Sequence, residues 1–120
     1  MPSYIVLANY TEQGIRTIKD SPRRTNAGKA LARRFGGKIQ QFYLTMGAYD
    51  FVAVFDMPND ETMAKFLLAT GTAGNARTTT LKAFGEPAFR RIVRGVPLDA
   101  YAPTRRGVRR GARRRRRRAR

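Results

Sequence analysis

The 120-residue chain contains neither cysteine nor histidine. Without cysteine it can form no disulfide and no thiolate metal site, and a reducing compartment is permitted. Without histidine it lacks imidazole base catalysis, a histidine haem ligand, the usual zinc sites and every Ser-His or Cys-His pair. Asp, Glu, Tyr, Lys and Arg are left for chemistry, and we expect no metal and no cofactor.

Long apolar runs are also missing. The start of the chain, Met1 to Asn9, has one short apolar run but no basic leader and no small-residue cleavage pattern. No stretch approaches the roughly 20 apolar residues that cross a bilayer as a helix. We therefore expect a cytoplasmic protein without a membrane span.

Acidic residues are absent from the last sixteen positions, Arg105 to Arg120, of which eleven are arginine. Residues 97–120 carry a net charge of +10 out of +17 for the whole chain, and they contain too few apolar residues to offset the entropy of ordering. We expect residues 97–120 to form a disordered tail and residues 1–96 to form one domain with a single thin core.

The arginine-rich tail has the composition of a phosphate-binding segment, since arginine forms bidentate contacts with phosphate. The alternative is a solvated charge run that only aids solubility. Aromatic residues are not interleaved with the arginines, so we expect nonspecific, salt-sensitive binding of nucleic acid or another polyanion without base stacking. The polyanion-binding candidates are Arg105, Arg106, Arg109, Arg110, Arg113, Arg114, Arg115, Arg116, Arg117, Arg118 and Arg120.

The first half of the domain has a strand, a helix and a second strand. Tyr4–Ala8 is a continuous apolar run that favours a strand. One or two helical turns are expected over Thr11–Lys19, and Ser21 with Pro22 predicts a longer helix, with Ser21 as its cap, that ends at Gly36 and Gly37. Lys38–Met46 alternates imperfectly, with Phe42, Leu44 and Met46 on one face and Ile39, Gln41 and Tyr43 on the other.

The second half begins with a β-hairpin. The turn Gly47–Asp50 joins Lys38–Met46 to the apolar strand Phe51–Phe55, with Gly47 suited to positive φ. A helix is expected to open at Pro58–Asp60 and to end near Gly71 and Gly74, followed by a strand over Thr78–Phe84. A last short helix begins at Glu86 and Pro87 and closes at Gly95.

The order β-α-β-β-α-β predicts an α+β fold, the ferredoxin-like sandwich, with sheet order 4-1-3-2. The first and third strands, which have no polar residue, suit its two central positions. Two helices cover only one sheet face, yet both central strands are apolar on both faces. We expect a second copy to cover the other face, giving a dimeric α/β barrel. In the alternative, the face is exposed to solvent, and small Ala8 and Ala53 only reduce its apolar area.

In this topology the ends of the first two strands and the starts of the last two share one rim. The rim collects five candidate ligand-binding residues: Thr11, Tyr49, Asp50, Asn75 and Arg77. In the functional interpretation, a small polar pocket lies between sheet and helices or between subunits, where Arg77 holds an anionic group and Tyr49 or Asp50 handles a proton. In the structural interpretation, which we favour, Asp50 caps the hairpin, Tyr49 plugs the sheet edge and Arg77 neutralises Asp50.

Several separated blocks of the sequence resemble the GYD domain family. These are Tyr4–Tyr10, IKDSP at 18–22, FYLTMGAYDFV at 42–52 and GNARTTTLKAF at 74–84, with Gly47, Tyr49 and Asp50 matching the residues that give the family its name. The resemblance covers residues 3 to about 95 and implies a domain similar to dimeric α/β-barrel proteins. It implies no particular reaction, and the tail lies outside it.

These observations favour a cytoplasmic homo-oligomeric binding or accessory protein whose tail contacts nucleic acid. Two alternatives stay open. One is a small-molecule enzyme, such as an isomerase or monooxygenase-like catalyst, that uses the rim of Tyr49, Asp50 and Arg77, an analogy based on fold alone. The other is a structural oligomeric scaffold in which the rim is buried in subunit contacts.

Overall fold

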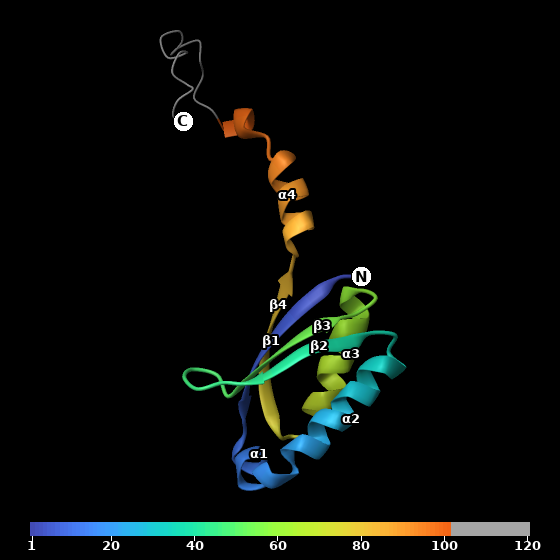
Figure 1. Ribbon diagram of the computed structural model, residues 1–120, viewed down its shortest axis with the longest axis vertical. Helices are drawn as coiled ribbons and strands as arrows, with labels where there is room; N and C mark the ends of the chain where they lie inside the picture. Colours follow the sequence, from blue (N-terminus) through green and yellow to red (C-terminus); the bar gives the residue numbers. More distant parts are fainter. Residues whose placement is uncertain (102–120) are drawn as a thin grey trace. The chain divides into compact units, whose positions relative to one another are not determined.

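A computed structural model describes residues 1–101 and has an α+β architecture, with four strands in one open sheet (Figure 1). The elements in chain order are β1 (Ser3–Tyr10), α1 (Glu12–Arg16), the 3-10 helix η1 (Ile18–Asp20), α2 (Ser21–Arg34), β2 (Lys38–Leu44), β3 (Phe51–Asp56), α3 (Asp60–Gly71), β4 (Ala76–Ala83), α4 (Glu86–Arg94) and the 3-10 helix η2 (Leu98–Tyr101).

Contacts divide the chain into two units, of which the first is Met1–Gly85 and the second begins at Glu86. Helix α4, which the predicted domain 1–96 includes, falls in the second unit. Within the predicted tail at 97–120, the structure describes the 3-10 helix η2 near its start. All eleven tail arginines lie outside the described residues.

Across the sheet the strand order is β2-β3-β1-β4, which is the order 4-1-3-2 read from the opposite edge. All three neighbouring pairs are antiparallel, and β1 and β3 are the central strands, as their apolar sequences indicate. The register places Val6 of β1 opposite Ala53 of β3 and opposite Thr80 of β4.

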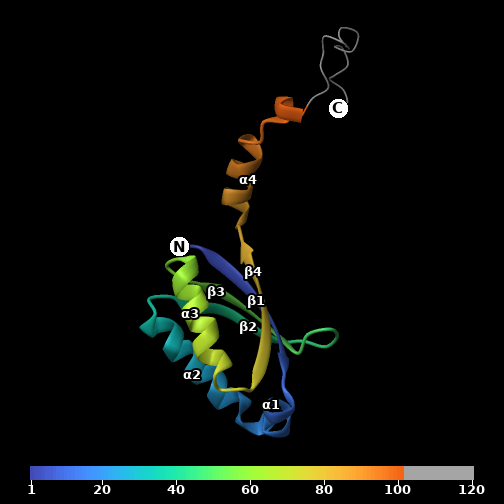
Figure 2. The same cartoon turned by 180° about the vertical axis from the view of Figure 1, so that it is seen from behind.

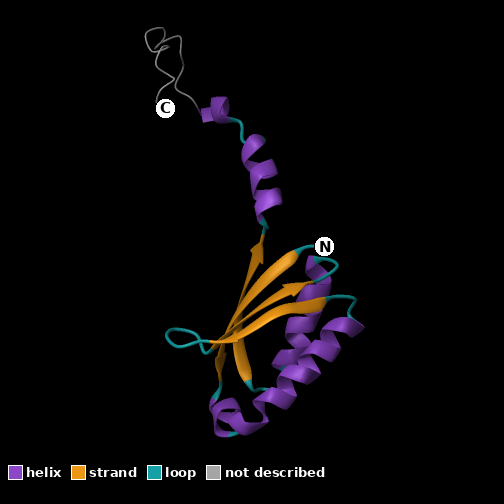
Figure 3. Cartoon of the chain, viewed as in Figure 1, coloured by secondary structure: helices purple, strands orange, loops and turns teal. Residues whose placement is uncertain are grey.

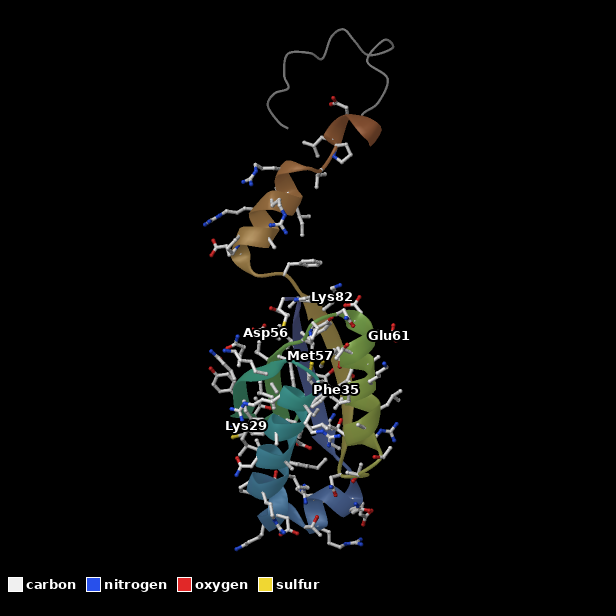
Figure 4. All side chains as sticks on the ribbon, turned by 90° about the vertical axis from the view of Figure 1, so that its right-hand side faces the viewer. Lys29, Phe35, Asp56, Met57, Glu61 and Lys82 are labelled. Atoms are coloured by element: carbon white, nitrogen blue, oxygen red, sulfur yellow. The ribbon has the colours of Figure 1, made fainter. Side chains whose placement is uncertain are left out.

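Helices α2 and α3 lie on one side of the sheet, and no described element of Met1–Gly85 covers the other side (Figures 2 and 3). Figure 4 looks onto this helix layer, with Phe35 and Met57 lying between the two helices. The core beneath it consists of buried side chains from β1, β3, the position directly after β3 and the helices: Tyr4, Val6, Ala32, Ala53, Phe55, Met57, Met63 and Phe66.

Residues that alternate with this core on the central strands belong to the opposite, open face, because successive side chains of a strand point to opposite sides. Ile5 and Leu7 of β1 and Val52 and Val54 of β3 occupy these positions and are half-buried. Leu81 of β4 pairs with Ile5 and is 47% exposed. We call Ile5, Leu7, Val52, Val54 and Leu81 the open-face patch.

Strand β2 departs from the predicted alternation at a β-bulge between Ile39 and Gln41. Ile39 and Phe42, three residues apart, both pack against the core. The prediction that they lie on opposite faces was therefore wrong, because the bulge inserts one unpaired residue into the strand. The strand also ends at Leu44, before the predicted Met46.

The helix ends follow the sequence signals in most places. Gly36 adopts φ 86° after α2, and Gly47 adopts φ 126° in the hairpin loop, as its position in the turn predicts. Asn59 caps α3 by accepting a hydrogen bond from the backbone N–H of Thr62. Ser21 is not the cap of α2, since η1 leads directly into the helix and Asp20 occupies the cap position without a side-chain hydrogen bond.

Candidate functional site

The predicted rim forms where β1 ends and β4 begins. Thr11 caps α1: its Oγ1 donates to the carbonyl of Gly74 at 2.6 Å and accepts from the N–H of Gly14 at 3.0 Å. Its backbone N–H donates to the carbonyl of Asn75 at 3.1 Å. Thr11 and Asn75 are therefore neighbours, and their contacts join α1 to the start of β4.

Asp50 is held at the same rim by backbone groups of β1. Its Oδ2 accepts the N–H of Tyr10 at 2.9 Å, and its own N–H donates to the carbonyl of Ala8 at 2.8 Å. The carbonyl of Tyr49 accepts a hydrogen bond from Thr45 Oγ1 at 2.7 Å, which closes the hairpin loop. These contacts fix the loop on the sheet, which is the structural role considered for Asp50.

Arg77 lies on the exposed surface of β4 and pairs across the strands with Asn9. Within residues 1–101 no ion pair or hydrogen bond joins its side chain to Asp50. The expectation that Arg77 neutralises Asp50 is therefore wrong for this arrangement. The backbone N–H of Tyr10 stabilises the carboxylate instead.

A cavity of about 360 Å³ lies between the sheet and helices α2 and α3. Aromatic side chains of both layers line it, among them Phe42, Phe51 and Phe66. Of the five rim candidates, Asn75 lines this cavity, whereas Thr11, Tyr49, Asp50 and Arg77 do not. This cavity has a mainly apolar wall, and apart from Asn75 its polar groups are not the rim candidates.

Three polar groups of the cavity come from the first turns of α2. Arg24 is its charged lining residue among the described residues, and Ser21 and Thr25 line it beside Arg24. Ser21 Oγ lies 3.0 Å from the hydroxyl of Tyr10, which also lines the cavity. Sequence reasoning missed Arg24 and Tyr10, although an arginine one turn inside an amphipathic helix is a signal that could have indicated the former.

A second polar cluster lies where β4 ends and α3 begins. Buried Tyr4 donates a hydrogen bond to Asp60, and the Lys82 ammonium lies 2.9 Å from Asp60 Oδ1. Burial, together with the hydrogen bond and charge of Asp60, raises the pKa of Tyr4 to about 12. The hydrogen bonds from Tyr4 and Lys82 lower the pKa of the Asp60 carboxyl.

Residues 4–93 match the model of the GYD domain, more than half of the chain. The chain belongs to the GYD domain family. A curated relative from Thermus thermophilus, described as a glutamine synthetase and cystathionine beta-lyase binding protein, is 34% identical over 84 residues. The alignment covers 69% of this chain and 88% of that protein. No solved structure matches the chain.

The GYD domain match includes the strands, α1 to α3 and most of α4, so both polar clusters and the cavity lie inside it. Among the described helices, none combines the length and apolarity required to cross a bilayer. Residues 1–101 bring together no group of three or more acidic side chains that could hold a metal ion.

Proposed function

We propose that this GYD domain protein is a homo-oligomeric accessory protein that binds another protein, with its arginine-rich tail contacting nucleic acid nonspecifically. In this proposal the subunit is ferredoxin-like, two copies pack sheet to sheet as a dimeric α/β barrel, and the assembly works in the cytoplasm. The observation that carries the proposal is the open-face patch.

The open-face patch is continuous across three strands, because Ile5 pairs with Val54 on one side and with Leu81 on the other, and Leu7 pairs with Val52. A contiguous apolar patch on a soluble domain usually marks an interaction surface. A second copy in two-fold symmetry is the simplest cover, since the same surface then serves both subunits.

The role as a binding protein is supported by the Thermus relative, whose description names glutamine synthetase and cystathionine beta-lyase as the proteins it binds. This chain has an exposed apolar projection suited to such a contact. The loop between β2 and β3 extends away from the helix layer (Figure 1), and Met46 in that loop is 97% exposed. Leu44, at the end of β2, is 73% exposed.

The tail part of the proposal rests on charge alone. Eleven arginines without an acid among residues 105–120 suit a phosphate backbone. Each phosphate neutralised contributes about −0.9 to the slope of log affinity against log salt on duplex DNA, so binding should weaken steeply as salt rises. The full chain and a variant with serine at all six positions 113–118 should therefore differ in this slope.

Sedimentation equilibrium of the full chain in high salt tests the dimer. We expect a dimer at about 1 to 50 µM. Val54→Lys places a charge in the open-face patch and should give monomers, whereas Ala30→Lys, on the exposed surface of α2, should stay dimeric. A monomeric wild-type chain over this range would overturn the dimeric barrel.

Binding to immobilised glutamine synthetase and cystathionine beta-lyase from the organism that encodes this chain tests the accessory role. Met46→Asp should weaken binding about tenfold or more, the size of effect expected from a buried anchor. Leu68→Asp is the matched control, because Leu68 is 73% exposed on α3, in the helix layer. Absence of binding to both enzymes would contradict this choice of partners.

A further inference from the structure

The cavity on the helix side has an apolar body. Besides the three phenylalanines already named, Leu31 of α2 and Leu67 of α3 line it, and no acidic residue does so among the described residues. Its volume of about 360 Å³ lies within the range of small-molecule sites. One water molecule occupies roughly 30 Å³ in the liquid, so the cavity has room for about a dozen non-hydrogen atoms.

One wall of the cavity is kept open by a glycine inside a helix. Gly28 is in the middle of α2, and a Cβ built on it would have no heavy atom within 4 Å. Glycine in a helix interior costs stability relative to alanine. At Gly37, by contrast, a Cβ would lie 2.2 Å from the carbonyl oxygen of Asp56, so close packing requires glycine there. Close packing does not explain Gly28, whereas an open cavity wall does.

Arg24 lies one helical turn before Gly28 on α2 and is half-buried. Its guanidinium donates to the carbonyl and Oγ1 of Thr17, at 3.1 and 3.0 Å, and to the carbonyl of Gly14 at 3.2 Å. These neutral partners hold the side chain in place but do not compensate its charge. None of the ion pairs within residues 1–101 includes Arg24.

An arginine guanidinium has five N–H donors, and the three contacts above leave two for a ligand. Two donors from one planar cation match one carboxylate, which binds arginine in a bidentate manner. The first turn of α2 adds the positive end of a 14-residue helix on the same side. Ser21 and the Tyr10 hydroxyl supply further polar atoms.

We propose that this cavity binds a small apolar monocarboxylate of about a dozen non-hydrogen atoms, with its carboxylate at Arg24 and its hydrocarbon body against the phenylalanines. The ligand enters on the helix side, away from the open-face patch. Binding therefore does not depend on the dimer, and either proposal can fail without the other.

Decanoate, with about twelve non-hydrogen atoms, is a suitable probe. Isothermal titration of the full-length protein in 0.5 M NaCl limits nonspecific attraction to the arginine-rich tail, because salt screens exposed charges. We expect saturable binding of one decanoate per chain. Decanol, which has the same hydrocarbon body without the charge, should bind at least about tenfold more weakly.

Two variants locate the site. Gly28→Leu fills the cavity and should abolish binding, while Gly28→Ala adds a single methyl group, should weaken binding much less and serves as the control for folding at this position. Arg24→Gln should weaken decanoate at least about tenfold and leave decanol unchanged. Lys29→Gln is its matched control, since Lys29 carries the same charge on α2, is exposed and does not line the cavity (Figure 4).

Circular dichroism identifies any variant that fails to fold. Unchanged decanoate affinity in a folded Gly28→Leu protein would place binding elsewhere and overturn the proposal. Equal affinities for decanoate and decanol, equal losses in Arg24→Gln and Lys29→Gln, or no binding by the wild-type chain would overturn it as well.

Discussion

The Oγ1 atom of Thr80 is buried and has no hydrogen-bond partner among the described residues. Thr80 lies on β4 directly opposite Val6, which is 3% exposed, and so faces the core beneath the helices. An unpaired buried hydroxyl costs about 1–3 kcal/mol. Valine has nearly the same shape and places a methyl group where the hydroxyl was. We expect Thr80→Val to stabilise the domain by about 1–2 kcal/mol, and the higher strand propensity of valine acts in the same direction.

Urea unfolding at one fixed protein concentration measures this change, because self-association would otherwise shift the apparent stability. For a domain of this size, each kcal/mol also raises Tm by about 4–8 °C. Thr78→Val is the control: it lies two residues earlier on the same face but is exposed, so its effect should stay within about 0.5 kcal/mol. A Thr80→Val protein no more stable than the wild type would show that the hydroxyl has a partner and would refute the reasoning.

Two further predictions concern α1 and the Tyr4–Asp60 pair. Gly14 is buried and a Cβ on it would lie 2.0 Å from the carbonyl oxygen of Asn75, so Gly14→Ala should cost about 3 kcal/mol or more in urea unfolding, whereas Gly28→Ala should gain up to about 1 kcal/mol. Similar effects at both glycines would contradict the described approach of α1 to β4. The pKa of Tyr4 is raised from 10.0 to about 12. The contribution of neutral Tyr4 to the free energy of unfolding is therefore fully present below pH 10 and is lost as the pH rises through 12. Stability measured from pH 9 to 12 should therefore fall more steeply for the wild type than for Tyr4→Phe, and parallel curves would exclude a raised pKa.

Local signals in the sequence were sufficient to predict most of the fold. The apolar runs of β1 and β3, Gly36 after α2, and Asn59 before α3 each determine structure through nearby residues. Their order along the chain then restricts the topology to few arrangements. The central positions of β1 and β3 follow from sequences that are apolar on both faces.

The candidate site was harder to predict because its contacts join distant parts of the chain. Asp50 binds the N–H of Tyr10, 40 residues away, rather than the arginine that charge complementarity suggested. The cavity depends on the separation of two helices from the sheet, and sequence periodicity does not encode that separation. The position of Arg24 beside the cavity likewise depends on how α2 lies over the sheet.

The bulge in β2 changes which residues of the strand face the core. Before it, odd-numbered Ile39 faces the core, and after it, even-numbered Phe42 does so, while Gln41 and Tyr43 share the other side. Tyr43 is thereby assigned to the same side of the sheet as Val52, its partner on β3. One unpaired residue thus allows the core to keep both Ile39 and Phe42 while an aromatic ring is added to the surface that would meet a second copy. Deleting that residue, Gln40, would leave a regular strand with the same side chains on each face.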